Sequence, residues 1–390
     1  YEQKLYASSN LTITEESTQG HYTISKPDET QTYADVLANI NKRFNDFSLV
    51  ANVGASIVNN RYEDLSYRGP IREKGIPNVF NVFDLDNTKK KARQDEWQEQ
   101  TQSVFASVEV GWKSMLYLTL TGRNDWASQL ANSSTPCFFY PSVGLSGVIS
   151  EMLTLPEFID YMKVRGSFSS VGMPYPRNLT SPTYEYDEAN QQWKPKTHYP
   201  IKDLKPERTN SWELGLDMRL FKDFSLGFSW YLANTFNQTF DPKVSVSSGY
   251  SKIYLQTGYV RNSGVELSLG YGHTWNNHLH WESNFTLSHN KNTIKDLVTS
   301  YIHPETGLPI TQNRLDVGGL GKARFILKKG GTLGDLYTQS DLKRDNSGMV
   351  EIDPSGALTT EDNLPDIKLG SVFPKANLAW NNRFEWRGIS

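Results

Sequence analysis

The chain has 390 residues, a formal net charge of -3 and 37% hydrophobic residues, and Cys137 is its only cysteine. The near-neutral charge excludes the basic stripe of a nucleic-acid-binding protein, and the single cysteine excludes an intrachain disulfide and a Cys-rich metal site. A transmembrane helix is excluded as well, because no run of about 18 apolar residues exists. The sequence opens on Tyr1 without a Met, a charged segment or an apolar segment typical of a signal peptide, so we expect any export signal to lie outside this sequence.

Residues 1 to about 30 are polar, and we interpret them as a long loop that includes the end of a strand at residues 5–7. Residues 34–41 then alternate between apolar and polar side chains, which is the period of a β-strand with two different faces. A tight turn at residues 44–47 follows, and the alternation resumes through residues 48–57. Two strands joined by so short a turn are antiparallel neighbours.

The same pattern recurs after a polar stretch of about 40 residues that carries no alternation. Residues 104–110 and 116–120 alternate on either side of a short turn. Residues 143–149 lead into a link at 150–160, where we expect one helical turn, and residues 162–168 lead out of it. A loop of about 35 residues then precedes the clearest hairpin.

That hairpin occupies residues 208–231, with a break of only three residues at 221–223. Its polar face consists largely of Ser, Gly, Asn and Thr with isolated charges, whereas the outward face of a soluble sandwich usually carries long solvated side chains. Apolar residues toward lipid and polar residues toward a lumen are the arrangement of transmembrane β-barrels. The apolar positions of its first strand are Trp212, Leu214, Leu216, Met218 and Leu220.

Further copies follow toward the end of the chain. Residues 265–271 and 279–287 alternate around a turn at 275–278, and residues 376–386 alternate after a polar segment of about 80 residues that begins at Asn290. Arg387 and Gly388 have the composition of another tight turn.

The lengths of the connections separate two architectures. Every second connection is minimal, and the connections between them run from about 10 to about 80 residues, as in barrels with short periplasmic turns and long extracellular loops. Aromatic rings flank the short turns and predict an interfacial girdle, although such rings also cap soluble cores. These rings belong to Phe44, Phe47, Trp112, Phe221, Phe224, Trp275 and Trp386.

We therefore predict an all-β chain that forms a transmembrane antiparallel up-and-down β-barrel wall of about eleven strands. Single-chain bacterial outer-membrane barrels have even strand numbers and no unpaired edge in lipid. We expect residues 1–390 to be one portion of a larger barrel, with the wall continuing before Tyr1 and after Ser390.

Several segments, in order along most of the chain, resemble the SusC/RagA family of TonB-dependent outer-membrane transporters. The resemblance implies a barrel of about 22 strands closed by an N-terminal plug, a multi-pass location in the bacterial outer membrane, a SusD-like surface lipoprotein as a lid, and energy from the TonB complex. The family's plug and TonB box have no counterpart in this sequence. The matching segments are LTLTGRNDWAS (118–128), FFYPSVGLSGVISE (138–151), MKVRGSFSSVG (162–172), LKPERTNSWELGLD (204–217), GYVRNSGVELSLGY (258–271), LGDLYT (333–338) and PKANLAWNNRFEWRGIS (374–390).

Two groups of residues are candidates for contacts. Polar residues on the lumen side of the strands are expected to hold the plug by salt bridges and hydrogen bonds. Aromatic residues in the loop before the clearest hairpin are expected to contact the ligand or the lid, since flat rings stack on sugars and peptides; the alternative is that they pack the loop against its neighbours. The lumen candidates are Glu109, Glu213, Asp217, Arg219 and Glu266, and the aromatic candidates are Tyr175, Tyr184, Tyr186, Trp193 and Tyr199.

No catalytic constellation is present in the sequence, so we expect neither enzymatic activity nor a cofactor. The oxygen-rich segment 345–348, with Glu351 and Asp353, is a candidate calcium loop, but its spacing does not match an EF-hand. We predict TonB-dependent import of a large nutrient. An oligosaccharide is the first choice and an oligopeptide the second. The alternatives are a passive porin or structural outer-membrane protein, and a secreted β-sandwich carbohydrate-binding protein.

Overall fold

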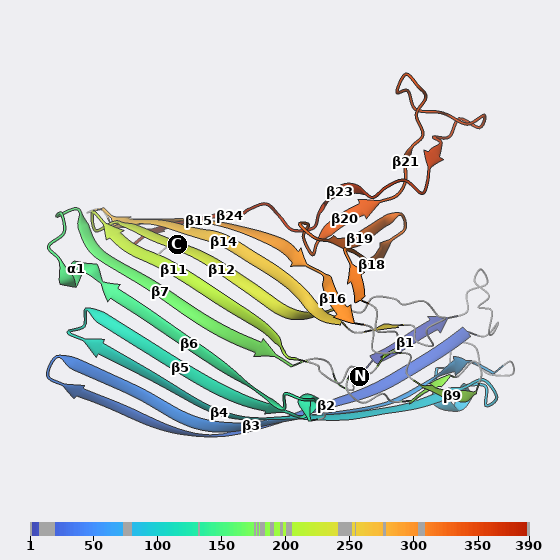
Figure 1. Ribbon diagram of the computed structural model, residues 1–390, viewed down its shortest axis with the longest axis horizontal. Coiled ribbons are helices and arrows are strands. Elements are labelled where there is room, and N and C mark those ends of the chain that lie inside the picture. Colours follow the sequence, from blue (N-terminus) through green and yellow to red (C-terminus); the bar gives the residue numbers. More distant parts are fainter. Residues whose placement is uncertain are drawn as a thin grey trace. The chain divides into compact units, whose positions relative to one another are not determined.

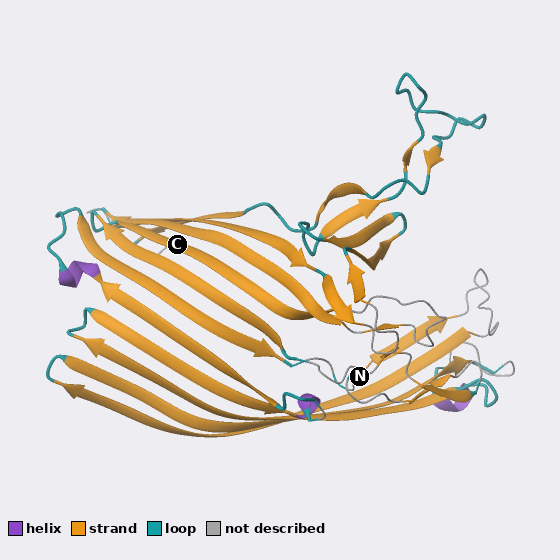
Figure 2. Cartoon of the chain, in the orientation of Figure 1, coloured by secondary structure: helices purple, strands orange, loops and turns teal. Residues whose placement is uncertain are grey.

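The computed structural model describes residues 2–7, 20–72, 80–131, 133–174, 177, 179, 184–187, 191–195, 198–199, 205–240, 252–253, 255–275, 278–302 and 309–387. Strands dominate these residues (Figure 2). The helical elements among them are α1 (Ile149–Met152), η1 (Val82–Asp84) and η2 (Ser128–Leu130). No helix in the described ranges is long and apolar enough to cross a membrane.

Twelve strands form one large sheet, and its spatial order follows the order of the chain (Figure 1). Wherever the register of neighbouring strands in this sheet is described, the pairing is antiparallel, which confirms the predicted up-and-down topology. The link predicted to hold a helical turn contains α1. The strands are β1 (Glu2–Ala7), β2 (Gly20–Phe44), β3 (Phe47–Pro70), β4 (Lys91–Trp112), β5 (Leu116–Ala127), β6 (Cys137–Val148), β7 (Ile159–Met173), β11 (Glu207–Leu220), β12 (Phe224–Phe240), β14 (Leu255–Thr274), β15 (Leu279–Asp296) and β24 (Asn377–Trp386).

The chain forms two compact units. The first contains Tyr1–Val36, Gly54–Val104 and Asp125–Ser128, and the second contains the remaining residues. In the first unit, polar side chains link β2, β3 and β4: Ser25 donates to Asp64 at 2.7 Å and Gln98 donates to Asn59 at 2.7 Å. The Tyr62 and Trp97 rings stack with centroids 5.5 Å apart.

These contacts correct the predicted boundaries. The interpretation of residues 1–30 as a loop is wrong for 20–30, which belong to β2, and β3 and β4 extend into the polar stretch that carried no alternation. Polar side chains on both faces remove the period-two signal from the sequence. The strands persist because the backbone ladder and cross-strand side-chain pairs do not require an apolar face.

In the second unit, the register aligns side chains of one kind across neighbouring strands. One row consists of Leu216, Phe228, Leu267, Leu287 and Leu378 on β11, β12, β14, β15 and β24. The adjacent row consists of Gly215, Ser229, Glu266, Ser288 and Asn377. Because successive side chains point to opposite faces, one face of the sheet is apolar and the other is polar.

The apolar face is open. Trp212 is 53% exposed and Leu214 is 57% exposed, so no second sheet covers this side of β11 within the described part of the chain. Two packed sheets would bury these side chains in a common core. The β-sandwich alternative is therefore excluded.

Aromatic rings form a continuous ladder near the short turns of four consecutive strands. The ring centroids of Phe224 and Tyr271 lie 4.8 Å apart, those of Tyr271 and Trp281 5.2 Å, and those of Trp281 and Phe384 5.8 Å. Rings at one level of a barrel wall are typical of the girdle at a membrane interface.

The polar segment that begins at Asn290 contains more regular structure than the sequence indicated. A four-stranded sheet forms in the order β18, β19, β20, β23. Its last pairing, of β20 with β23, joins segments that are distant in the sequence. The strands of this segment are β16 (Val298–Ile302), β17 (Pro309–Gln312), β18 (Arg314–Leu320), β19 (Ala323–Lys328), β20 (Asp335–Thr338), β21 (Asp341–Leu342), β22 (Thr360–Glu361) and β23 (Ile367–Ser371).

This small sheet is fixed to the large one. Val260 of β14 and Ile294 of β15 are buried with Leu297, Leu315 and Leu327 in one hydrophobic cluster. The Ile294 N–H donates to the Gly331 carbonyl at 2.8 Å, and the Gly330 N–H donates to the Ile294 carbonyl at 2.8 Å. The predicted long polar loop is thus partly a packed subdomain.

A buried carboxylate connects the strands of the small sheet. Asp366 accepts two hydrogen bonds from the Arg314 guanidinium, at 2.7 and 2.9 Å, and Lys328 Nζ lies 2.9 Å from Asp366 Oδ2. The hydrogen bonds from Arg314 hold the pKa of Asp366 well below its usual range, with further lowering by Lys328.

This lowered pKa predicts a pH dependence of the small sheet. Because the folded pKa lies below the unfolded one, the carboxylate stabilises the sheet above pH of about 4 and this contribution is lost as pH falls through the folded pKa. Asp366→Asn should lower the local opening free energy at pH 7 by about 1–2 kcal/mol, measured by hydrogen exchange of β18 and β19. Asp341→Asn, at an exposed position on β21, is the control and should leave that exchange unchanged. Equal exchange in the two variants would contradict the assignment.

The two faces of β14 provide a second test. Leu267→Arg should lower the free energy of unfolding in lipid vesicles by about 2–4 kcal/mol, the cost of a cation facing lipid near the bilayer centre. Ser268→Arg, one residue further on the polar face, should cost much less. Equal losses, measured by urea titration, would show that the faces are wrongly assigned.

Candidate functional site

Arg165 of β7 lies at the centre of a polar cluster with Glu213 and Asp217 of β11 and Ser229 of β12. Arg165 Nη1 donates to Glu213 Oε1 at 3.0 Å, and Arg165 Nη2 donates to Ser229 Oγ at 2.7 Å. Arg165 Nε lies 3.8 Å from Asp217 Oδ2. We call these four residues the Arg165 cluster.

The strand register explains how one side chain reaches three strands. Arg165 is paired with Gly215, which is paired in turn with Ser229. A Cβ atom at Gly215 would lie only 2.4 Å from Arg165 Nε. The absence of a side chain at Gly215 therefore lets the guanidinium cross β11 and contact the residues on either side.

The cluster is only half-buried and carries more negative than positive charge. The side chains of Arg165, Glu213 and Asp217 are 38%, 45% and 47% exposed. Two carboxylates around one guanidinium leave an excess of one negative charge. Each ion pair at this exposure contributes little to stability, so the arrangement is better suited to recognition than to holding the fold.

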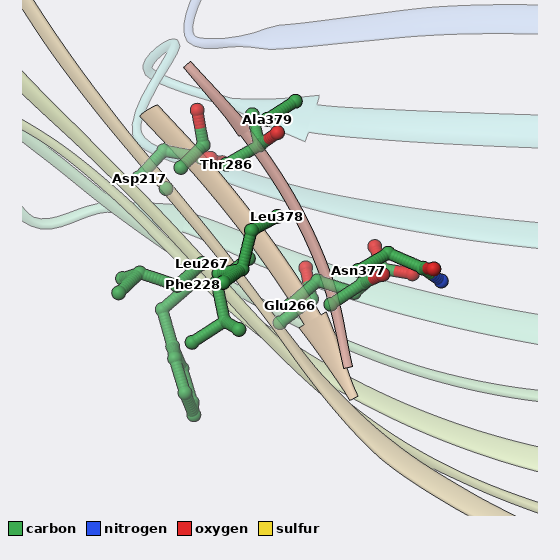
Figure 3. Close-up of a pocket in the computed structure, with 13 residues that line it drawn as sticks. Asp217, Phe228, Glu266, Leu267, Thr286, Asn377, Leu378 and Ala379 are labelled. Atoms are coloured by element: carbon green, nitrogen blue, oxygen red, sulfur yellow. The ribbon is translucent and has the colours of Figure 1, made fainter. Parts of the chain in front are cut away.

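A pocket of about 370 Å³ extends from β11 and β12 across β14, β15 and β24, with Asp217 and Glu266 in its lining. Figure 3 shows Phe228, Leu267 and Leu378 on one side of the strands and Glu266 and Asn377 on the other. The row that contains Asp217 continues through small side chains, which leave space on the polar face. These small residues are Gly227, Ser268, Thr286 and Ala379.

The five lumen candidates thus separate into groups. Glu213 and Asp217 meet in the Arg165 cluster, and Glu266 lies in the same row as Ser229, on the next strand, β14. Glu109 accepts a hydrogen bond from Thr119 Oγ1 at 3.3 Å, and Thr119 lines a smaller pocket of about 120 Å³ with Arg165 and Glu213. Arg219 is exposed and pairs with Tyr161 and Ser225, nearer the short turns.

The sequence interpretation missed Arg165 and Ser229. The alternation could have identified both. Arg165 lies between Val164 and Gly166 of a recognised strand, and Ser229 lies between the apolar residues Phe228 and Trp230. What the alternation could not give is the register that places Arg165 beside Gly215.

Four of the aromatic candidates lie on short strands whose side chains are outside the described part of the structure: Tyr184, Tyr186, Trp193 and Tyr199. The fifth, Tyr175, lies outside the described residues. β8 (Tyr184–Asp187) and β9 (Gln192–Pro195) form a hairpin in which Tyr186 is paired with Trp193. Tyr199 belongs to β10 (His198–Tyr199), which pairs with β13 (Lys252–Ile253). Their contact with a ligand or a lid stays a prediction.

The candidate calcium loop is internally hydrogen-bonded. Asp345 Oδ1 accepts from Ser347 N, Ser347 Oγ and Met349 N, at 2.8, 2.6 and 2.9 Å. The residues that the structure describes contain no group of three or more His, Cys, Asp or Glu side chains arranged to hold a metal ion. Calcium binding here remains untested.

A family model described as "TonB dependent receptor-like, beta-barrel" matches residues 2–348. The chain belongs to this TonB-dependent receptor family. The predicted resemblance is thereby confirmed, and the family is one of outer-membrane β-barrel receptors.

Two relatives come from Formosa agariphila. TonB-dependent receptor P39 is 23% identical over 339 residues, covering 83% of this chain and 30% of P39. TonB-dependent receptor P26 is 26% identical over 226 residues, covering 56% of this chain and 23% of P26. The chain therefore spans less than a third of the length of these relatives.

Solved structures show the same fold. The structure titled as the RagAB peptide transporter superposes with a TM-score of 0.75 at 15% identity, over 98% of this chain and 42% of that chain. The RagAB peptide importer in its "open-open" state superposes with a TM-score of 0.70 at 17% identity, over 98% of this chain and 41% of that chain. At these identities the likeness establishes the fold alone.

The Arg165 cluster predicts a measurable coupling. A double-mutant cycle with Arg165→Met and Glu213→Gln should give a coupling free energy of about 0.5–1 kcal/mol, because the pair is half-exposed. The control pair Arg383 and Glu385 lies within one strand, β24, and its arginine is 58% exposed, so it should give a value near zero. Urea titration in lipid vesicles measures both, and a coupling no larger than the control would remove the cluster as an organised site.

Proposed function

We propose that this chain forms barrel wall in a TonB-dependent importer of oligomeric nutrients that works with a SusD-like surface lipoprotein. The observation that supports the proposal is the family match together with the two-faced register, in which the leucines and the Arg165 cluster lie on opposite faces of the sheet. The wall shields the conduit from hydrocarbon, and no covalent chemistry is required of its residues.

The polar face is proposed to hold the plug until the importer is energised. Glu213, Asp217 and Glu266 present carboxylates beside a row of small side chains, where a neighbouring domain can approach the strands closely. Because each exposed ion pair is weak, contacts of this kind can be broken and remade during transport.

The ligand is proposed to be an oligosaccharide or an oligopeptide. The aromatic residues paired across the β8–β9 hairpin support either class, since flat rings stack on sugars and on peptides. The fold likeness to RagAB, titled a peptide transporter, supports the oligopeptide. The lipoprotein partner is proposed from the resemblance to the SusC/RagA family that the quoted segments carry.

Dependence on TonB distinguishes this proposal from a passive porin. In cells that carry the complete protein, uptake of labelled oligosaccharides and oligopeptides should fall to background when TonB is removed, because displacement of a plug needs the proton-motive force. Uptake that persists without TonB would support the porin and contradict the proposal. The ligand class transported in the TonB-containing cells decides between sugar and peptide.

A further inference from the structure

The small sheet packs against the polar face of the large sheet. Val260 on β14 is separated from Glu266 by an even number of positions, and Ile294 on β15 is related in the same way to Ser288. Since side chains two residues apart in a strand share a face, Val260 and Ile294 point to the side of Glu266. The hydrophobic cluster that buries them therefore places the small sheet over the polar face, at the end away from the short turns.

Residues 329–334, which we call the docking loop, hold the small sheet to β15. Ile294 exchanges two backbone hydrogen bonds of 2.8 Å with this loop. The Leu333 N–H donates to Asn292 Oδ1 at 2.9 Å, and Asn292 Nδ2 donates to Asn262 Oδ1 of β14 at 2.9 Å. The docking loop is thus bonded to the backbone of one wall strand and, through Asn292, to a second.

A buried carboxylate fixes the docking loop to the rest of the small sheet. The Asp335 side chain is fully buried and accepts hydrogen bonds from the Thr332 N–H at 3.1 Å, from Thr332 Oγ1 at 2.6 Å and from Lys368 Nζ of β23 at 2.7 Å. Withdrawing these donors is costly, because it leaves a buried charge without its partners. Movement of the docking loop therefore requires movement of the small sheet as a whole.

The contact between the two sheets does not have the character of a mobile loop. Segments that open easily have few buried apolar contacts and many exposed backbone hydrogen bonds. Here Val260, Ile294 and Leu327 are almost completely buried, and the backbone hydrogen bonds to Ile294 lie beside them. The small sheet is therefore built as a fixed part of this end of the wall.

We propose that the small sheet is a fixed partition over the extracellular end of the polar face, and that it sets the upper size of the ligand that the importer admits. The inference rests on the proposed function, in which the polar face lines the conduit. A ligand that moves along this face must pass beside the small sheet, because the partition does not swing away. The space left beside it then selects ligands by their cross-section.

The reactivity of one cysteine tests the partition directly. In the complete protein, Asn290→Cys places a thiol at an exposed position on the polar face of β15, near Asn292, and Cys137→Ser removes the native thiol. The undocking variant adds Leu315→Ser and Leu327→Ser, which remove two side chains of the hydrophobic cluster. Relative to a small maleimide, a polyethylene glycol maleimide should react severalfold faster with the undocking variant than with the protein that keeps both leucines.

A control variant makes the same kind of change outside the cluster. Val317→Ser with Leu320→Ser alters two exposed residues of β18 and should leave the ratio of the two rates unchanged. Equal ratios in the undocking and control variants would overturn the partition. If the undocking variant does not fold, Asn292→Leu, which removes the acceptor of the Leu333 N–H, takes its place with the same expected direction.

Import measures the size limit. Cells that carry the complete protein are given size-fractionated peptides from digested casein and size-fractionated oligosaccharides from digested starch. The undocking variant should admit fractions larger than the largest that enters with the unaltered protein, and the control variant should not. An unchanged limit would overturn the size selection alone. If no fraction enters in the presence of TonB, the proposed function fails instead, and the labelling of Asn290→Cys still judges the partition.

A cross-link decides whether the small sheet has to move. Lys329 Nζ lies 2.7 Å from Asp296 Oδ1, so cysteines at these two positions can be joined by a short bifunctional thiol reagent, again with Cys137→Ser. A fixed partition predicts the same import and the same size limit before and after cross-linking. Import that is lost on cross-linking would show that the small sheet opens during transport, and the proposal would be wrong.

Discussion

The alternation of side chains between the two faces of the sheet is the constraint on which the rest of this structure depends. The apolar row through Leu267 and the polar row through Glu266 are neighbours, so a slip of one residue in any strand would exchange them. Lipid on one side and a polar interior on the other make such a slip costly. The register is thereby fixed over strands that have few buried side chains to lock them.

The fixed register also determines where polar groups meet. Arg165 can reach Ser229 across β11, and Glu213 on β11, because Gly215 lies between Arg165 and Ser229 in the same row and has no side chain. Neither the arginine nor the glycine is unusual by itself in a strand. Their adjacency organises the polar face around one guanidinium, through contacts that are individually weak.

The sequence predicted the parts of the fold that the membrane dictates. The alternating segments, the short turns and the aromatic rings beside them were all recognised, because lipid imposes a period of two on one face. It did not predict the polar halves of β2, β3 and β4, where polar side chains on both faces remove that period. Strand β1 (Glu2–Ala7) was recognised only at residues 5–7.

The candidate site was predicted to a similar extent and for similar reasons. Alternation identified Glu213, Asp217 and Glu266 as residues of one face, but only the strand pairing shows which of them meet Arg165. The four-stranded sheet beyond Asn290 depends on pairing between distant segments, such as β20 with β23. Local patterns carry no information about pairing of that kind.

The way the small sheet is fixed to β15 has a consequence for the assembly of the wall. Strands β15 and β24 are paired, although the chain between them runs from the end of β15 at Asp296 to the start of β24 at Asn377. Ile294 is bonded to Gly331, and Gly334 accepts a bond from Val372, so the ends of the interval are already drawn together once the small sheet has formed. Such a shortcut reduces the entropy cost of closing the interval by roughly 2 kcal/mol. An extracellular insertion of this size can therefore enlarge without delaying the strand that follows it.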